Sequence, residues 1–491
     1  MTWVDGEKVT ATKLNSWMPT NTTNSYTYLV RKNGSDYEAY SASGLLTYGG
    51  SIDAGGVDGA DAAAVIQAVF NTNPQSVFFK AATYDLNGMT LTCASPVILF
   101  GDGNSKSIFK DGTINITEGT WADTGTFIHD LQFEVAGNRV ALHFTKVITA
   151  YIQRVHITKT SYSPDVPSLW LTSCDTFRIE DNWFDMYQMQ IIRIDGNESK
   201  SLPVHIIERN DFGSTAVAFP AYTDPWQVAA IYIADATQEA TFIKDNIGYL
   251  NSENTFVYSI APYTWVVGNN IGCGKGKYTV DLLGGFNMVQ GNYINAADGS
   301  LGAIRFKTGV ANDRNSITNN HLYMGADITA LSGLQYHSVI SDNVVYFSET
   351  GFDLTNCAYN IISNNVFLLS VAGTGLAINE AGTAQYNLFI GNYFGVAGAY
   401  LSVTAAALSV YNHNFGYVSE NNGASTGTGA QQTIAHGCNF TPSYDQVFLS
   451  ERSTGGALAY QSAVPDAVNI YITAVNGKTY NWKVTNRWGF M

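Results

Sequence analysis

The sequence predicts an all-β protein whose main body is a single-stranded parallel β-solenoid. A six-residue pattern, apolar-x-x-Asn-x-apolar, first occurs at residues 179–184 and recurs eight more times before residue 395. A repeat of roughly 20–50 residues is typical of a solenoid. Apolar residues within each copy follow short spacings and are rich in Ile, Val, Phe and Tyr, which favours strands over helices. The repeated asparagines are Asn182, Asn210, Asn246, Asn270, Asn292, Asn320, Asn343, Asn365 and Asn392.

The repeated asparagine suggests how successive coils are joined. Asparagine tolerates the left-handed backbone conformation that a sharp turn needs. Asparagines stacked at one corner are also expected to form a hydrogen-bonded ladder along the solenoid axis. Residues 128–133 and 152–157 fit the same frame without the asparagine. One coil cannot bury its apolar face alone, so stacking is expected to build one continuous core.

Composition narrows the choice of partners. The chain has 491 residues, of which 25 are basic and 40 acidic, giving a net charge of −15. This charge argues against nucleic acid or an anionic membrane as the main partner. The N-terminus has no basic region followed by an apolar run, and no apolar run reaches about 18 residues. We therefore expect synthesis in the cytoplasm, no signal-peptide export and no membrane insertion.

The cysteines do not predict a metal site. The chain has five cysteines, which are far apart in the sequence and form no C-x-x-C pair. This argues against zinc and against a disulfide framework. No cofactor and no metal are expected. Cys174 and Cys357 each precede a repeated asparagine by eight residues, so we expect buried small residues at one position of the coil. The five are Cys93, Cys174, Cys273, Cys357 and Cys438.

The N-terminal 110 residues differ from the repeats. Residues 1–48 are polar and aperiodic, apart from a short helix expected at 11–17, and are interpreted as an adaptor. Residues 49–110 are expected to contain a helix, capped by Asp58 or Asp61, with an apolar stripe between residues 65 and 70. Strands are expected at 77–80, 83–86 and 96–103. A helix over the open end of a solenoid would cap its core.

A second pattern, apolar-x-apolar, lies 10–19 residues before most of the asparagines. Period-two alternation places the middle residue on the outside of the coil. The predicted outward column mixes aromatic with charged side chains, which suits sugar rings and their hydroxyl or acid groups. The alternative interpretation is a solvated sheet face with Arg–Asp pairs between coils. The column consists of His143, Trp170, Arg193, Tyr232, Asp281, Arg305 and Asp353.

Two carboxylates near this column are the candidate catalytic pair. Asp195 and Asp235 are expected one coil and one residue apart, or roughly 5–8 Å, which suits glycoside hydrolysis. The alternative is that both are ordinary turn residues. Asp281 and Asp353 are expected about three coils apart, roughly 14 Å, too far to act together. An insertion at 213–230 carries Trp226 and is predicted either to wall a groove here or to be a plain surface loop.

Three stretches near the start resemble a known family. Residues 56–68 read Gly-x-x-x-x-Asp followed by Ala-x-x-Ile-Gln-Ala, residues 77–84 read Val-Phe-Phe-x-x-x-x-Tyr, and residues 97–103 read Val-Ile-Leu-x-Gly-x-Gly. Together they resemble the pectate-lyase-like right-handed β-helix family over roughly residues 49–415. More closely, they resemble the phage tailspike and tail-fibre proteins that carry this β-helix. Ala62 stands where family members often have a second acidic residue.

Both ends of the chain extend the resemblance. Residues 3–15 are similar to the opening of many phage tail proteins. A glycine-rich linker at 423–430, followed by expected strands at 446–450, 468–473 and 480–485, resembles the small β-sandwich that ends many tail fibres. His436 in this module is interpreted as a structural hydrogen-bonding residue. The resemblance implies residues 1–48 for attachment, 49–110 for the cap and first coils, 111–420 for the β-helix, and 421–491 for a β-sandwich used in trimerisation or receptor binding.

The resemblance implies a function. It implies a homotrimeric tailspike in the virion tail, assembled in the host cytoplasm and attached to other tail or baseplate proteins through its N-terminus. Such a protein would bind and depolymerise a host surface polysaccharide. Hydrolysis is favoured over lyase chemistry, because the calcium-binding acidic clusters of pectate lyases are not evident. A non-enzymatic tail fibre or structural virion protein is the first alternative, and a free polysaccharide lyase is the second.

Overall fold

The structure is a computed structural model of the chain. It describes residues 27–41, 44–45, 62–118, 125–161, 163, 165–185, 190–196, 204–213, 224–236, 240–250, 255–273, 278–296, 301–306, 314–324, 329–332, 336–369, 375–395, 401–403, 409–415, 420–438, 441–452 and 459–485.

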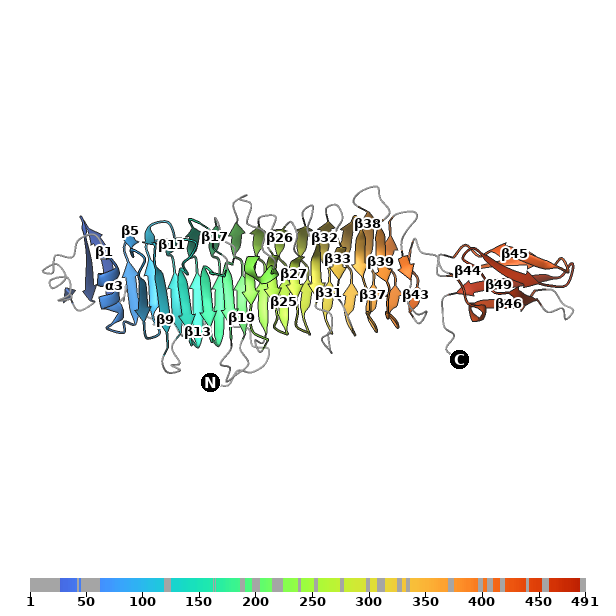
Figure 1. Cartoon of the computed structure of the whole chain (residues 1–491), viewed down its shortest axis with the longest axis horizontal. Coiled ribbons are helices and arrows are strands. Elements are labelled where there is room, and N and C mark those ends of the chain that lie inside the picture. The colour runs from blue at the N-terminus through green and yellow to red at the C-terminus, as the bar shows by residue number, and fades with distance from the viewer. Residues whose placement is uncertain are drawn as a thin grey trace.

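Three parallel sheets run side by side along an elongated solenoid (Figure 1). Each coil adds one strand to sheet A, then to sheet B, then to sheet C. Sheet A contains β4 (Ser76–Phe79), β7 (Ile98–Gly101), β10 (Thr126–His129), β13 (Thr149–Gln153), β16 (Thr176–Glu180), β19 (His205–Glu208), β22 (Thr241–Lys244), β25 (Thr264–Val267), β28 (Met288–Gln290), β31 (Ser316–Thr318), β34 (Val339–Ser341), β37 (Ile361–Ser363), β40 (Leu388–Ile390) and β43 (Val410–Asn412).

Sheets B and C repeat the same order. Sheet B contains β5 (Ala82–Asp85), β8 (Ser107–Lys110), β11 (Gln132–Val135), β14 (His156–Lys159), β17 (Trp183–Asp185), β20 (Asp211–Gly213), β23 (Ile247–Tyr249), β26 (Asn270–Cys273), β29 (Tyr293–Ala296), β32 (His321–Met324), β35 (Val344–Phe347), β38 (Val366–Leu369) and β41 (Tyr393–Phe394). Sheet C contains β6 (Thr90–Cys93), β9 (Thr113–Thr117), β12 (Leu142–Thr145), β15 (Leu169–Thr172), β18 (Ile192–Asp195), β21 (Ala229–Ile233), β24 (Thr255–Ser259), β27 (Tyr278–Leu282), β30 (Gly302–Phe306), β33 (Thr329–Ser332), β36 (Thr350–Asp353), β39 (Leu376–Glu380) and β42 (Leu401–Val403).

The core is one continuous column of inward side chains. Ile152, Ile179 and Ile207 are paired in register on successive strands of sheet A and are fully buried. Each inward residue packs against the coils above and below it, so no coil buries its apolar face alone. The fold class predicted from the repeat, a parallel β-helix, is confirmed.

The asparagine ladder lies at the corner between sheets A and B. The backbone N–H and the side-chain amide of Asn343 both donate to Oδ1 of Asn365, at 3.0 and 2.8 Å. The same amide also donates to the backbone carbonyl of Ile317 at 2.9 Å. The ladder contains Asn269 and not the predicted Asn270, which instead begins β26. Two adjacent asparagines made that prediction ambiguous.

The left-handed residue is the one before each ladder asparagine. Asp181, Asp342 and Asn364 have φ values of 55°, 59° and 55°. The prediction that the asparagine itself takes this conformation is therefore wrong. The preceding residue makes the turn, and this leaves the asparagine side chain pointing inward to bond its neighbours along the axis. Arg154, before the asparagine-free position at Val155, also has a positive φ, 51°, so the same frame continues upstream.

A second ladder lies five residues before the first and was not predicted. The backbone N–H of Asn287 donates to Oδ1 of Asn315 at 2.9 Å, and the pattern continues through Ser338 and Asn360. All four side chains are buried. Because serine and asparagine share these positions, no single residue type marks this ladder in the sequence.

The N-terminal end of the solenoid is capped by a helix and extended by a hairpin. Helix α3 (Ala62–Phe70) buries Val65, Ile66, Val69 and Phe70, so the predicted capping helix and its stripe are confirmed. Its predicted caps, Asp58 and Asp61, and the helix predicted at 11–17 lie outside the described residues.

The hairpin extends the fold into the segment interpreted as a separate adaptor. Strand β1 (Tyr28–Asn33) pairs with β2 (Asp36–Ser41), and β2 pairs with β3 (Gly44–Leu45). Strand β1 also pairs in parallel with β4, which adds the hairpin to the end of sheet A. Val30 of this hairpin is buried in the solenoid core.

The C-terminal module consists of two three-stranded antiparallel sheets (Figure 1). One sheet has the order β44 (Glu420–Thr426), β49 (Thr479–Thr485), β46 (Val447–Glu451), and the other β45 (Gln431–Ala435), β48 (Asn469–Thr473), β47 (Tyr460–Ala463). A short 3-10 helix, η2 (Tyr444–Gln446), precedes β46. Their shared core is formed by Ile434, Cys438, Val447, Leu449, Ala459, Ile470, Ile472, Ala474, Tyr480, Trp482 and Val484.

Two predictions for this module have different outcomes. The glycine-rich linker is wrong in its first half, because Gly423 lies inside strand β44 and pairs with Trp482. His436 is buried, its Nδ1 accepts the backbone N–H of Cys438 at 3.0 Å, and its Nε2 lies 3.1 Å from the carbonyl of Asp466. The structural role predicted for His436 is confirmed. In the solenoid, Cys174 and Cys357 are buried as predicted.

Candidate functional site

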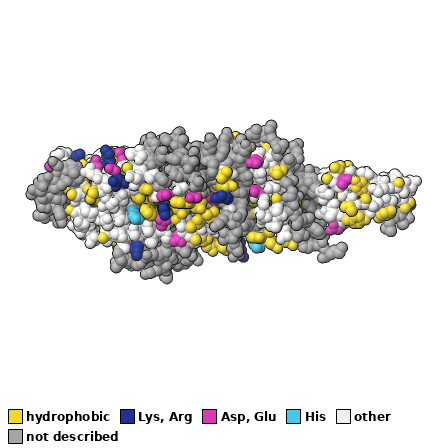
Figure 2. All heavy atoms as spheres, in the orientation of Figure 1, with side chains coloured by type: hydrophobic (Ala, Val, Ile, Leu, Met, Phe, Trp, Pro, Cys, Tyr) yellow, Lys and Arg dark blue, Asp and Glu magenta, His cyan; other side chains and the backbone are white. Residues whose placement is uncertain are grey.

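The outer face of sheet C carries the predicted column in register. Hydrophobic side chains gather with charged ones along the middle of one face of the solenoid (Figure 2). Strand pairing aligns the middle residues of successive strands from β12 to β33. In coil order they are His143, Trp170, Arg193, Tyr232, Tyr258, Asp281, Arg305 and Ser332.

Four of these side chains form a continuous stack. The rings of His143 and Trp170 lie 4.9 Å apart and nearly parallel, at 22°. The guanidinium of Arg193 lies 5.1 Å from the Trp170 ring and 5.5 Å from the Tyr232 ring, so it contacts an aromatic face on both sides. Burial lowers the pKa of His143, although the charge of Asp195 opposes the shift. The imidazole is therefore neutral near pH 7.

The carboxylate of Asp195 is fixed by two donors from this stack. Trp170 Nε1 donates to Oδ2 at 2.6 Å, and Arg193 Nε donates to Oδ1 at 2.9 Å. One donor comes from the preceding coil and one from the same strand. Charge-assisted bonds of this kind hold a carboxylate in one orientation. Asp195 is therefore positioned beside the aromatic stack.

Asp235 lies at the same corner, one coil further along. The pairing of Ile194 with Ile233 sets Asp195 beside residue 234, with Asp235 one residue beyond. A Cβ built on Gly196 would lie 3.6 Å from Oδ2 of Asp235. The adjacent coils and one-residue offset expected for the two aspartates are thus present. Their catalytic role stays a prediction.

The insertion between β20 and β21 places an aromatic ring over the column. Helix η1 (Pro225–Val228) carries Trp226, whose ring lies 5.7 Å from that of Tyr232 at 30°. The side-chain amide of Gln190 donates to the Trp226 backbone carbonyl at 2.8 Å, which ties the insertion to the solenoid. Of the two interpretations of this insertion, a wall beside the column agrees with the placement of Trp226.

Tyr258 belongs to the column but was missed in the sequence. Its ring lies 5.6 Å from that of Tyr232, at 64°. Burial raises the pKa of Tyr258 to about 12, with a further contribution from the charge of Asp281. The strand reads Val257-Tyr258-Ser259, so a buried serine replaces the second apolar residue of the search pattern. Buried small polar residues at that position would have been the signal to include.

The predicted column required Asp281 to face solvent, but its side chain is buried. Its side chain is 1% exposed, and Arg305 from the next coil donates to both of its oxygens, at 2.9 and 2.5 Å. Burial raises the pKa of Asp281, and the Arg305 guanidinium opposes that shift. At this end of the face, the alternative interpretation of Arg–Asp pairs between coils is correct. Asp353 accepts bonds from Thr355 and Asn379 on its own and the next coil.

A different carboxylate pair lies on the outer face of sheet A. Glu180 and Glu208 are paired in register on adjacent coils, and their side chains are 3% and 1% exposed. Arg178 and Arg209 lie 2.7 and 2.9 Å from Glu180, and Lys244 lies 2.6 Å from Glu208. Burial and the bond to Glu208 raise the pKa of Glu180 to about 7. The cations cover both carboxylates, so we assign this cluster to stability.

Two features are absent from the described residues. Among them, no three His, Cys, Asp or Glu side chains are grouped so as to hold a metal ion. No helix in the described part of the chain is long and apolar enough to cross a membrane.

The scan against protein-family models finds no match, and neither does the search of curated proteins. Among solved structures, the chain is similar to the Pseudomonas phage phi297 tailspike gp61, at 12% identity and a TM-score of 0.41, over 87% of this chain and 92% of that one. It is also similar to the tailspike of E. coli bacteriophage HK620 in complex with pentasaccharide, at 11% identity and a TM-score of 0.49, over 86% and 88%.

A third similar structure is a mannuronic acid-specific polysaccharide family 6 lyase from the human gut microbiota. It has 15% identity and a TM-score of 0.43, and the match covers 73% of this chain and 86% of that one. Two of these three similar structures are thus tailspikes, and the third is a polysaccharide lyase.

Proposed function

We propose that the chain is a phage tailspike subunit that binds a host surface polysaccharide on the outer face of sheet C and hydrolyses it. The observation that carries this proposal is the stack of His143, Trp170, Arg193 and Tyr232, with the fixed carboxylate of Asp195 beside it. Because neighbouring side chains cover the ring faces within this stack, we expect the glycan to contact the ring edges and the polar groups beside them. The sequence resemblance to tailspikes supports the same assignment.

Asp195 and Asp235 are the proposed catalytic carboxylates. In glycoside hydrolysis one carboxylic acid protonates the leaving oxygen, while the other carboxylate activates water or attacks the sugar directly. Asp195, which Trp170 and Arg193 hold in one orientation, is assigned the role of base or nucleophile. Asp235 takes the role of the acid, and the Trp226 ring lies beside Tyr232 at the edge of the site.

The second candidate function is binding without cleavage. The hydrogen bonds that Trp170 and Arg193 donate to Asp195 favour this function. A carboxylate held in this way can serve only to fix the stack in place, without taking part in catalysis. Under this alternative the same aromatic face holds the glycan, and the chain is a tail fibre or structural virion protein.

The test is release of reducing ends from capsular or lipopolysaccharide fractions of candidate hosts. We expect release by the wild type and a loss of at least about 100-fold in Asp195→Asn and in Asp235→Asn. Asp211→Asn, an exposed aspartate on sheet B, is the matched control and is expected to keep full activity. Release by all variants would discard this pair. Binding without release by the wild type would favour the second function.

We also propose that three copies associate through the outer face of sheet A. The number three follows from the resemblance, and the face from its side chains. An exposed apolar stripe of this length, interrupted between Met288 and Val339 by Ser316, is unusual for a monomeric protein. Beside the stripe, corner rings of successive coils stack, as in Tyr359 and Tyr386 at 4.9 Å. The stripe consists of Ile206, Phe242, Trp265, Met288, Val339, Ile361, Leu388 and Val410, all partly or fully exposed.

Light scattering tests this association. The wild type is expected at three times its chain mass of 53.2 kDa, and Ile361→Glu, which places a charge on the stripe, is expected to dissociate. Val344→Glu on sheet B is the control, and a monomeric wild type would remove the proposal. Residues 1–48 are proposed to attach the trimer to other tail or baseplate proteins, after assembly in the host cytoplasm.

A further inference from the structure

A shallow pocket of about 520 Å³ lies on the β44–β49–β46 sheet of the C-terminal module. Three rows of the antiparallel register cross it. The first joins Asn422, Lys483 and Phe448, and the second joins Gly423 with Trp482. The third row joins Ala424, Asn481 and Ser450. The volume is within the range of roughly 300–1,000 Å³ that is usual for small-molecule sites.

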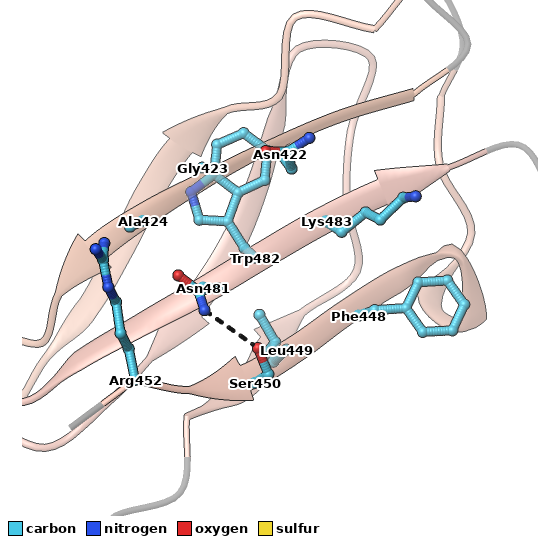
Figure 3. Close-up of a pocket in the computed structure, with 10 residues that line it drawn as sticks. All are labelled: Asn422, Gly423, Ala424, Phe448, Leu449, Ser450, Arg452, Asn481, Trp482 and Lys483. Atoms are coloured by element: carbon cyan, nitrogen blue, oxygen red, sulfur yellow. Dashed lines mark hydrogen bonds between the residues drawn. The ribbon is translucent and has the colours of Figure 1, made fainter. Parts of the chain in front are cut away.

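Small residues on β44 make the hollow. Gly423 has no side chain, and the Trp482 indole occupies the space on its inner side, where a Cβ on Gly423 would lie 2.6 Å from the ring. Ala424 adds only a methyl group to the floor. In Figure 3, Phe448 and Lys483 stand at one end of the pocket and Arg452 at the other. The pocket is thus a short trough between two raised ends.

The lining has the chemistry of an acidic-sugar site. Phe448 is 48% exposed and offers an aromatic ring to a sugar face. Asn422, Asn481 and Ser450 offer amide and hydroxyl groups for sugar hydroxyls.

Charge narrows the ligand further. Arg452 and Lys483 are cations, and none of the ten lining residues is Asp or Glu, although the whole chain carries a net charge of −15. Arginine binds carboxylates in a bidentate geometry that neutral sugars cannot use. The lining therefore favours a sugar that carries a carboxylate over a neutral one.

We propose that this pocket binds a carboxylated sugar unit of the polysaccharide that the solenoid engages. Arg452 holds the carboxylate, and Asn481 and Ser450 bond hydroxyls of the same sugar. Phe448, at the other end of the pocket, packs on a neighbouring sugar of the polymer. This inference rests on the proposed function, since it gives the same polymer a second contact point on each chain. Two linked contacts raise the overall affinity without any new contact at the first site.

Saturation-transfer NMR on the full chain tests the pocket with two small probes, methyl β-D-glucuronide and methyl β-D-glucoside. We expect the glucuronide to bind, and the glucoside to bind at least fivefold more weakly. Arg452→Gln is expected to weaken glucuronide binding at least fivefold. Lys478→Gln, which removes a cation of the same module outside the pocket, is expected to change it less than twofold. Equal loss in both variants would show general electrostatic attraction and overturn the proposal.

A variant that keeps the charge of the pocket but fills its volume tests whether the ligand binds inside the pocket. Ala424 is exposed, so Ala424→Tyr is expected to fill the trough, keep the thermal unfolding midpoint and abolish glucuronide binding. Retained glucuronide binding in Ala424→Tyr would overturn the proposal. The monosaccharide measurement is independent of polymer cleavage. Failure of this pocket is therefore distinguishable from failure of the proposed function.

Discussion

Trp170 Nε1 donates a hydrogen bond of 2.6 Å to Oδ2 of Asp195, which lies on the next coil of sheet C. The same indole stacks on His143 and against the guanidinium of Arg193. The indole is therefore held in the stack by neighbours on both coils, and its N–H positions the candidate catalytic carboxylate. The ring and its N–H are separable by mutation.

Trp170→Phe keeps a ring and removes the N–H, whereas Trp170→Ala removes both. We expect Trp170→Ala to weaken binding to the immobilised polysaccharide about tenfold, or about 1.4 kcal/mol. Trp170→Phe is expected to bind within threefold of the wild type but to release fewer reducing ends, because Asp195 loses a donor. Equal effects of the two variants on both assays would show that the hydrogen bond has no separate role.

The asparagine ladder predicts that removing one buried side-chain amide lowers the unfolding free energy substantially. In Asn343→Ala, the backbone N–H and the amide of Asn320 both lose the acceptor that they bond at 2.9 and 3.0 Å. Leaving buried donors unsatisfied costs about 1–3 kcal/mol each, so we expect the unfolding free energy to fall by about 3 kcal/mol. Guanidinium chloride unfolding measures this. Asn295→Ala, at an exposed position of β29, is expected to change it by less than about 0.5 kcal/mol.

The buried ion pair of Asp281 and Arg305 predicts that breaking a buried pair lowers the unfolding free energy more than breaking an exposed pair does. Arg305→Met leaves a carboxylate that is 1% exposed without its partner, and we expect a loss of about 3–5 kcal/mol of unfolding free energy. Arg154→Met breaks a more exposed pair with Asp130 and is expected to cost less than about 1 kcal/mol. Equal losses would contradict the role of burial. Adding Asp281→Asn to Arg305→Met is expected to recover part of the loss.

Lys159 predicts a pH dependence of stability. Its side chain is buried and donates to the carbonyls of Gly137 and Val166, at 3.1 and 2.6 Å. Burial lowers the pKa of Lys159 from 10.5 to about 7. Between these values the unfolded chain binds a proton that the folded chain does not, so this group makes the unfolding free energy rise as pH rises from about 7 to 10.5.

Lys159→Met is expected to remove this rise. The measurement is the difference in unfolding free energy between the wild type and the variant at pH 7, 8 and 9. Lys110→Met, at an exposed position of β8, is the control and is expected to follow the wild type at every pH. A constant difference between the wild type and Lys159→Met would show that Lys159 does not titrate in this range.

The sequence determined the elements whose pattern is local. Alternation and repeat length were enough for the strands, the parallel solenoid, helix α3 and the outward column from His143 to Tyr232, because these patterns lie within one or two coils. Asn269 was confused with Asn270 because two neighbouring asparagines fit the frame almost equally well. Tyr258 was lost because the buried Ser259 replaces the apolar residue that the pattern required.

Only the tertiary structure decided which outward residues are accessible. Asp281 has the alternation of a solvent-facing residue, yet Arg305 of the next coil and its other neighbours bury it. Gly423 reads as linker sequence, yet the Trp482 indole, 59 residues later, packs against it and makes it part of a strand. Alternation fixes the direction of a side chain, whereas burial and hydrogen bonding depend on side chains that reach the position from other coils. These contacts between coils arise only when the coils stack, so no single segment of the sequence encodes them.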